Sequence, residues 1–219
     1  MPKIITIDGP AGSGKSTIAR EVAKRLGFTY LDTGAMYRAF TLKAIKANVD
    51  LEDSKGLIEL IKKTNIDIIA QKDGSLKVLL DKEDVTLEIR KPVVTQKVSF
   101  IARIPGIRAQ MVKLQRQFGK KNDIVVEGRD IGTVVFPEAY KKFYLDADFG
   151  ERIRRRMRDF EALGQKICPK EVEDDLKKRD NADMTRSVGP LKQAKDAILL
   201  DTTNLNIEQV IEKMLSYIK

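Results

Sequence analysis

The stretch Asp8-Gly-Pro-Ala-Gly-Ser-Gly-Lys-Ser-Thr17 decides the fold of this chain of 219 residues. Residues 9–16 fit the pattern Gly-x-x-x-x-Gly-Lys-Ser/Thr, a phosphate-binding loop whose glycines let backbone N–H groups converge on phosphate oxygens. Lys15 can reach the β and γ phosphates of a nucleoside triphosphate, and the Ser16 hydroxyl can ligate Mg²⁺. The residues predicted to bind ATP are Gly9, Pro10, Ala11, Gly12, Ser13, Gly14, Lys15, Ser16 and Thr17, with Ser16 as the predicted metal ligand.

The segments around this loop have the context that the motif requires. Residues 3–8 form a short β-branched run typical of a buried strand, and residues 15–26 place Ile18, Val22 and Leu26 on one helical stripe. Short apolar strands separated by helices predict a three-layer α/β P-loop fold with a five-stranded parallel sheet. The other predicted strands are 28–31, 123–127, 142–146 and 197–201, and the other predicted helices of this alternation are 34–47, 148–163, 170–183 and 206–218.

An insertion interrupts the alternation of strands and helices. Two apolar runs flank an Asp-Gly turn and predict a hairpin, hence a small antiparallel sheet. The predicted parts of the insertion are a helix at 52–63, strands at 66–70 and 76–80 around the turn Lys72-Asp73-Gly74-Ser75, and helices at 91–101 and 106–118.

Composition excludes several classes of protein. With 42% hydrophobic and 33% charged residues the chain is neither a disordered tail nor a membrane protein, and the absence of histidine removes Ser-His-Asp triads and the commonest zinc sites. The chain enters an apolar strand at once without a signal peptide, and the single cysteine, Cys168, allows a reducing compartment. We therefore expect a cytoplasmic protein.

Arginine distinguishes between classes of P-loop protein. A regulatory GTPase needs an Asn-Lys-x-Asp motif, which is missing, and Ile124–Glu127 only partly fits the acidic strand end of a motor or transport ATPase. A small-molecule kinase needs a second anion pocket rich in arginine. Arg38, Arg108, Arg129, Arg179 and Arg186 lie near Gly, Pro or Asp residues and favour this third class.

A helix at 148–163 carries five more arginines. Arg152, Arg155 and Arg156 share one helical face, which we predict to contact phosphate, whereas Arg154 and Arg158 lie on a side predicted to be solvated.

Four segments together resemble a known family. They are Asp8-Gly-Pro-Ala-Gly-Ser-Gly-Lys15, Leu31-Asp-Thr-Gly-Ala-Met-Tyr-Arg38, Glu127-Gly-Arg-Asp-Ile-Gly-Thr-Val-Val-Phe-Pro137 and Arg179-Asp-Asn-Ala-Asp-Met-Thr-Arg-Ser-Val-Gly-Pro-Leu191. From end to end the chain resembles the bacterial cytidylate kinase (CMP kinase) family of P-loop nucleoside monophosphate kinases.

The resemblance implies a reaction and a domain organisation. The expected reaction converts ATP and CMP or dCMP into ADP and CDP or dCDP with Mg²⁺, in pyrimidine metabolism. The expected P-loop core is 1–34 and 120–219, with a helical lid at roughly 149–183, and the expected CMP-binding region with its insert is 35–119. The expected partners are small nucleotides, with neither nucleic acid nor membrane, and the expected state is a monomer.

Site residues also follow from the resemblance, position by position. Lys15, Arg129, Arg152 and Arg156 would be catalytic, with Arg152 beside the adenine and Arg156 beside the transferring phosphoryl group. The CMP site would comprise Thr33, Arg38 and Arg129 at the phosphate, Ser99, Arg108 and Asp130 at the cytosine edge, Arg179 and Asp183 near the sugar, and Arg186 as a further phosphate-binding arginine. Position 33 is often serine in related enzymes, and threonine keeps the hydroxyl.

Residue chemistry supports the base contacts independently. Asp130 can accept from an exocyclic amine such as cytosine N4, and Arg108 can donate to ring nitrogen or carbonyl acceptors. The alternative for Asp130 is an ion pair with a nearby arginine or a helix cap.

Three other functions remain to be weighed. Leu31-Asp32-Thr33-Gly34-Ala35 matches an aspartic-protease signature, but that chemistry needs two aspartates in a nearly all-β fold. The net charge of +9 suggests a nucleic-acid-binding P-loop ATPase, although aromatic residues make up only 6% and tryptophan is absent. A P-loop kinase of the UMP/CMP type is the third alternative.

Overall fold

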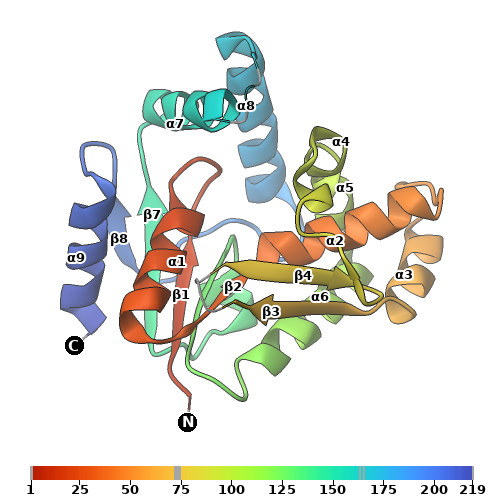
Figure 1. The fold of residues 1–219 in the computed structure, drawn as a ribbon, viewed down its shortest axis with the longest axis horizontal. Coiled ribbons are helices and arrows are strands. Elements are labelled where there is room, and N and C mark those ends of the chain that lie inside the picture. The colour runs from red at the N-terminus through yellow and green to blue at the C-terminus, as the bar shows by residue number, and fades with distance from the viewer. Residues whose placement is uncertain (1, 72–74, 163, 165, 219) are drawn as a thin grey trace.

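The central sheet runs through the middle of the molecule (Figure 1). The computed structural model describes residues 2–71, 75–162, 164 and 166–218. Within these residues five parallel strands lie in the order β2-β6-β1-β7-β8, which confirms the predicted sheet. The strands are β1 (Ile4–Asp8), β2 (Thr29–Asp32), β6 (Ile124–Gly128), β7 (Lys141–Asp146) and β8 (Ile198–Asp201).

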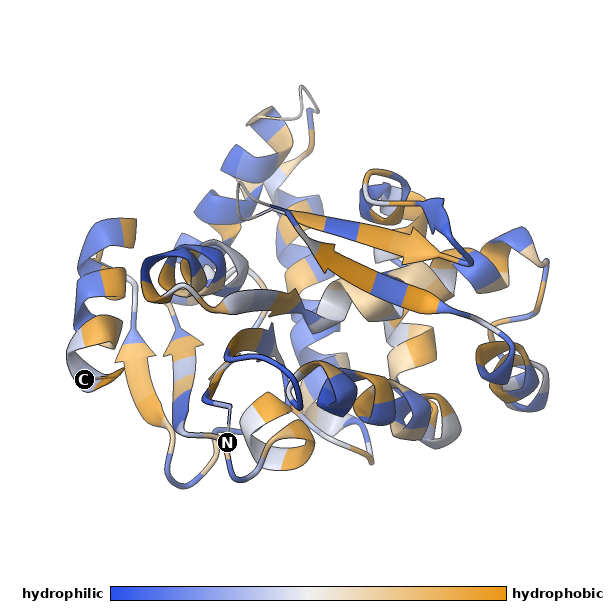
Figure 2. Ribbon diagram, turned by 60° about the horizontal axis from the view of Figure 1, so that its bottom comes forward, coloured by the Kyte–Doolittle hydropathy of each residue, from blue (hydrophilic) through white to orange (hydrophobic). Residues whose placement is uncertain are grey.

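Helices cover both faces of this sheet because its strands are apolar on both sides. Val125 of β6 belongs to a core with α1 (Lys15–Leu26) and α9 (Ile207–Ile218), whereas its neighbours in sequence, Ile124 and Val126, belong to a second core. The second core contains α2 (Thr33–Lys46) and α6 (Pro105–Phe118). Figure 2 shows apolar strands between helices that carry both apolar and polar residues.

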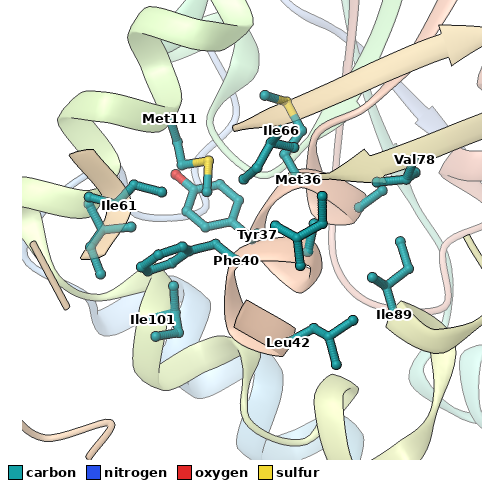
Figure 3. Close-up of a cluster of buried hydrophobic side chains, with 14 of the residues drawn as sticks. Met36, Tyr37, Phe40, Leu42, Ile61, Ile66, Val78, Ile89, Ile101 and Met111 are labelled. Carbon is teal, nitrogen blue, oxygen red and sulfur yellow. The ribbon is translucent and has the colours of Figure 1, made fainter. Parts of the chain in front are cut away.

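The inserted region packs onto the second core. Phe40 of α2 is fully buried beside Ile61 and Ile101 (Figure 3). A three-stranded antiparallel sheet in the order β3-β4-β5 lies over α2 and contains both predicted hairpin strands. The predicted turn residues 72–74 lie outside the described residues. The elements are α3 (Ser54–Lys62), β3 (Ile66–Ala70), β4 (Leu76–Leu80), β5 (Glu83–Asp84), η1 (Glu88–Arg90), α4 (Pro92–Thr95) and α5 (Val98–Ala102).

The single helix predicted at 91–101 is wrong, because the structure has two short helices, α4 and α5. The β-branched run Val93-Val94-Thr95 makes up most of α4, and its low helix propensity favours a helix that ends after one turn. Val94 of α4 and Ile101 of α5 are both fully buried in the second core, so each short helix is anchored there by a residue of its own. The short strand β5 was not predicted, since two acidic residues carry no strand signal.

Two helices stand above the phosphate loop (Figure 1). They are α7 (Phe149–Ala162) and α8 (Pro169–Thr185), which pack on each other and, through Val172 and Leu176, on Ala11. The predicted end of α7 at residue 163 lies outside the described residues. None of the helices in the described ranges is both long and apolar enough to cross a membrane.

A one-turn π-helix, η2 (Ile131–Val135), follows β6 after the two residues Arg129 and Asp130. Sequence reasoning missed it, because a run of Ile, Gly, Thr and two Val has low helix propensity. Long-range contacts with β1 hold it instead, as described below.

Candidate active site

A cavity of about 910 Å³ opens at the carboxyl ends of the parallel strands. The cavity is lined on the side of the sheet by the phosphate loop, the turn after β6 and the N-terminus of α2. Helices α5 and α6 line one end, and α7, α8 and the segment after β8 line the rest. One cavity therefore joins the phosphate loop to the arginine-rich segments.

The phosphate loop wraps around the start of α1. Gly12 and Gly14 have φ angles of 77° and 90°, in the left-handed region that favours glycine. Lys15 Nζ donates to the Pro10 carbonyl over 2.7 Å. Burial, together with the nearby Arg129 charge, lowers the pKa of Lys15 to about 7. Of the predicted ATP residues, Ala11 to Thr17 line the cavity, whereas Gly9 and Pro10 do not.

Ser16, at the end of this loop, is hydrogen-bonded to Glu127 at the end of β6. The Ser16 hydroxyl donates to Glu127 Oε1 over 2.5 Å, and Tyr30 donates to the same oxygen over 3.2 Å. Burial raises the pKa of Glu127, and the charge of Asp32 adds to this effect. Glu127 was not among the predicted site residues, although its place at the end of a buried strand was a usable signal.

The N-terminus of α2 holds an arginine over the cavity. The Asp32 carboxylate caps this helix by accepting from the Ala35 N–H over 2.8 Å, and it accepts from Arg38 Nη2 over 2.9 Å. Burial raises the pKa of Asp32, but the Arg38 charge and the Ala35 N–H outweigh burial and lower it. Thr33, also in the cavity wall, donates its hydroxyl to the Glu127 carbonyl over 2.7 Å.

Asp130 lies between two arginines at the far end of the cavity. Its carboxylate accepts from Arg108 Nη2 and, over 3.2 Å, from Arg186 Nη2. Arg108, Asp130 and Arg186 line the cavity together with Ser99 of α5. The ion pair that sequence reasoning weighed as the alternative for Asp130 is therefore present.

Asp183 connects two further arginines of this wall. It accepts from Arg129 Nε over 2.7 Å and from Arg186 Nη1 over 3.4 Å. Arg179 lines the same wall and lies 3.7 Å from Asp175. The structure thus brings together all nine residues predicted for CMP: Thr33, Arg38, Ser99, Arg108, Arg129, Asp130, Arg179, Asp183 and Arg186.

The arginines of α7 divide differently from the predicted faces. Arg155 and Arg156 line the cavity, and Arg155 donates to the carbonyl of Thr202 over 2.6 Å. Arg154 is exposed, as predicted. Arg158, predicted to be solvated, has a side chain 66% exposed but also reaches the cavity rim.

Arg152, predicted to be catalytic, does not line the cavity. Its Nη1 donates to the Ala11 carbonyl over 3.1 Å and to Asp180 over 2.5 Å. Its guanidinium also lies 5.0 Å from the centre of the Phe149 ring. The contacts that hold Arg152 come from α8 and the phosphate loop, so a helical wheel of α7 alone could not reveal them.

The segment after β8 supplies cavity residues that sequence reasoning missed. No motif marks this stretch, so no sequence signal could have found it. The lining residues there are Thr202, Leu205, Asn206, Ile207, Glu208 and Val210. Tyr37 lines the opposite end, and its buried hydroxyl has no hydrogen-bond partner among the described residues.

Comparison with known proteins identifies the relatives of this chain. The model of the family described as cytidylate kinase matches residues 5–219. The chain is 50% identical over 214 residues to the cytidylate kinase of Carboxydothermus hydrogenoformans, covering 98% of this chain and 96% of the relative. It is 48% identical over 215 residues to the cytidylate kinase of Caldanaerobacter subterraneus subsp. tengcongensis, covering 98% of this chain and 94% of the relative.

Solved structures share the fold at low sequence identity. A gluconokinase from Sinorhizobium meliloti 1021 is 12% identical with a TM-score of 0.51, covering 98% of this chain and 90% of that one. An uncharacterized protein from Eubacterium ventriosum is 13% identical with a TM-score of 0.55, covering 99% and 98%. These likenesses establish the fold alone.

Proposed function

The chain belongs to the cytidylate kinase family, and from this membership we propose how its residues carry out the reaction. It is an ATP-dependent nucleoside monophosphate kinase that transfers the γ-phosphoryl group of ATP to CMP or dCMP. The observation that carries the assignment of residues is that one continuous cavity joins the phosphate loop to a wall of arginines, here called the arginine wall and made of Arg38, Arg108, Arg129, Arg179 and Arg186. The nucleic-acid-binding ATPase weighed above is not favoured, because the family match covers residues 5–219.

The phosphate loop holds the ATP phosphates in this proposal. The backbone N–H groups of the loop and the N-terminus of α1 attract the phosphates. The Lys15 ammonium group turns from the Pro10 carbonyl to the β and γ phosphate oxygens of ATP. The negative charge of these oxygens favours the protonated form of Lys15, which burial disfavours. The adenine lies toward Thr202, Leu205 and Ile207, beside Arg155, because these residues line the end of the cavity remote from Asp130.

Ser16 and Glu127 would hold Mg²⁺ beside the phosphates. A hydroxyl and a carboxylate are oxygen ligands of the kind that Mg²⁺ prefers, and they already lie 2.5 Å apart. Among the described residues no group of three acidic or cysteine side chains forms a metal site, which fits an ion that takes most ligands from water and phosphate. When bound, Mg²⁺ neutralises phosphate charge.

The arginine wall holds CMP in this proposal. Thr33, Arg38, Arg129 and Arg186 surround its phosphate, and Arg179 and Asp183 face the sugar. Ser99, Arg108 and Asp130 read the base, since the carboxylate accepts from cytosine N4 and the guanidinium donates to ring acceptors. The ion pairs that Asp130 forms with Arg108 and Arg186 fix the orientation of the Asp130 carboxylate and of the Arg108 guanidinium.

Catalysis then rests on positioning and charge neutralisation. The CMP phosphate oxygen attacks the γ-phosphorus in line and needs no general base, because a phosphate monoester is largely ionised at neutral pH. Lys15, Arg129 and Arg156 offset the charge on the equatorial oxygens. Closure of α7 and α8 excludes water from the cavity.

The organisation of the molecule follows from these assignments. We propose a P-loop core of residues 1–34 and 120–219, a CMP-binding region of 35–119, and a lid of roughly 149–183. We also propose that the protein is a cytoplasmic monomer that binds small nucleotides and neither nucleic acid nor membranes.

The test is a coupled assay of ADP release against CMP, dCMP, UMP and AMP. We expect CMP and dCMP to give the highest kcat/KM. A preference for AMP or UMP would contradict the assigned base contacts. Arg38→Met should raise the KM for CMP and leave that for ATP nearly unchanged, and the exposed Arg154→Met serves as its control.

A further inference from the structure

We propose that Asp8, which no prediction or comparison assigns to the site, is a positioning residue that sets the spacing between the ATP and CMP sites. It does so by joining the phosphate loop to the turn that carries Arg129 and Asp130. This inference rests on the proposed function, because it takes those two residues as CMP contacts.

The geometry of Asp8 makes this connection directly. Asp8 ends β1 and is followed at once by Gly9, the first residue of the phosphate loop. Its two carboxylate oxygens accept from the backbone N–H groups of Ile131 and Gly132, each over 2.8 Å. Those two residues follow Asp130 directly, so one carboxylate ties together segments 123 and 124 residues apart in sequence.

The turn after β6 is shaped to receive this carboxylate. A Cβ atom on Gly132 would lie 3.0 Å from Thr6 Oγ1, 3.2 Å from Lys142 Cδ and 3.4 Å from Asp8 Oδ2. A methyl group at position 132 would therefore crowd Thr6 and Lys142, and the turn and β1 would have to move apart by a few tenths of an ångström. The π-helix η2 begins at Ile131, and its first two N–H groups are those that Asp8 binds.

Asp8 acts at a distance from the substrates. Its side chain is buried, only 4% of the residue is exposed, and it does not line the cavity. Because Asp8 lies outside the cavity lining and its oxygens accept from the N–H groups of Ile131 and Gly132, it is placed to hold this turn rather than to contact a nucleotide. Burial raises the pKa of Asp8 to about 6, against the lowering effect of the two N–H groups, so the carboxylate is mostly ionised at neutral pH.

Asp8→Asn is the test, because asparagine keeps the shape and removes one acceptor. Its amide nitrogen would face an N–H group that needs an acceptor. We expect kcat to fall about 10²-fold, as expected for a misplacement near 1 Å. Binding of CMP alone should weaken about 5-fold, the cost of one net hydrogen bond. Binding of ATP alone should change less than about 2-fold, since the loop keeps its own contacts.

Thr6→Ser is the matched control, because serine keeps the hydroxyl that lies against Gly132. Thr6 lies two residues earlier on the same face of β1, is fully buried, and its hydroxyl has no hydrogen-bond partner within the described chain. We expect this variant to keep the kinetics of the unaltered protein. Gly132→Ala disturbs the same contact from the other side and should reproduce the loss of kcat and of CMP binding. If Asp8→Asn fails to fold, the kinetics and CMP binding of Gly132→Ala test the proposal in its place.

Two results would overturn the inference. One is a lower melting temperature with unchanged kcat and CMP binding, which would show that Asp8 only stabilises the fold. The other is equal weakening of ATP and CMP binding, which would place the effect in the phosphate loop. The proposed function fails separately, if the unaltered protein does not phosphorylate CMP.

Discussion

Lys15 illustrates at the scale of one residue how a catalytic group is held at the expense of stability. It is 5% exposed, and burial lowers the pKa of its ammonium group to about 7 from 10.5. Between these pH values the unfolded chain binds more protons than the folded one, so stability rises with pH across that window. At and below pH 7 the folded protein carries the whole cost of a buried charge.

Lys15→Met should therefore separate activity from stability. We expect turnover to fall about 10²- to 10³-fold, as for the loss of one donor in a preorganised anion site. The free energy of unfolding without nucleotide should increase at pH 6.5 on the order of 2–4 kcal/mol, since a tenfold change in proton affinity is worth about 1.4 kcal/mol. This gain should shrink toward pH 10. Urea unfolding at both pH values measures it, and a destabilised variant at pH 6.5 would contradict the argument.

Asp130→Asn should lower kcat/KM for CMP more than for UMP. Asparagine can still accept from the cytosine amine and can also donate to the uracil carbonyl. It also leaves Arg108 and Arg186 without their shared carboxylate, which costs about 1–3 kcal/mol in both reactions. Steady-state kinetics with both substrates measure the ratio, and an unchanged ratio would move base reading away from Asp130. Asp175→Asn, half-exposed beside Arg179, is the control.

At the scale of elements, hydrogen bonds attach the phosphate loop to both α7 and α8. Asp180 of α8 accepts from the Ala11 N–H over 3.3 Å and from Arg152 of α7, which donates to the Ala11 carbonyl. A Cβ on Gly12 would lie 3.1 Å from Arg152 Cβ, so the helix and the loop are in close contact. Arg152 therefore acts on the loop, whereas Arg156 faces the cavity.

A double-mutant cycle tests this attachment. Arg152→Met and Asp180→Asn should each destabilise the protein, with a coupling free energy of about 1–3 kcal/mol because they share one buried network. Urea unfolding of the four proteins measures the coupling. The exposed pair Lys170 and Asp174 on α8 is the control, with an expected coupling of about 0–1 kcal/mol. Additive effects of Arg152→Met and Asp180→Asn would refute the attachment.

Arg156→Lys should lower kcat more than it raises either KM. Lysine lacks the planar fork that can grip two oxygens of the moving phosphoryl group. Arg158→Lys on the same helix is the control, because its side chain is mostly exposed and already pairs with Glu151. Initial rates over a range of both substrates separate kcat from KM. Equal effects at the two positions would mean that the helix acts through diffuse charge alone.

At the scale of the whole molecule, the cavity gathers cations that repel one another. Arg129, Arg179, Arg186 and Lys15 line one volume of about 910 Å³ in a chain of net charge +9. The nearby charge of Arg129 contributes to lowering the pKa of both Lys15 and Arg179, although burial is the larger cause in each case. Nucleotide phosphates relieve this repulsion, so binding should stabilise the entire fold.

CMP together with ADP, which do not react, should raise the free energy of unfolding. At 100 times its dissociation constant, one ligand adds about 2.7 kcal/mol. Arg38→Met should reduce the contribution of CMP and leave that of ADP intact. Thermal unfolding with each nucleotide alone and with both measures this, and an equal loss for both nucleotides would contradict separate sites.

Local patterns in the sequence were sufficient for the phosphate loop, the five parallel strands, the hairpin and most helices. A glycine pattern, a run of β-branched residues and a helical stripe each express their preference within a few residues. The hydrogen bonds that the carboxylates of Glu127, Asp8 and Asp180 accept could not be predicted from such local patterns. For each carboxylate, at least one of these bonds joins residues more than 100 positions apart in sequence.

Tertiary structure alone decided what these long-range contacts do. The strand order β2-β6-β1-β7-β8 places the end of β6 between the ends of β2 and β1, and this brings Glu127 to Ser16 and the turn after it to Asp8. Helix α8 likewise draws Arg152 away from the cavity through Asp180. The sequence determined which residues could bind phosphate, because that depends on local chemistry. Which of these residues line the cavity, and which instead hold other segments in place, depended on the segments that the sheet and helices brought together.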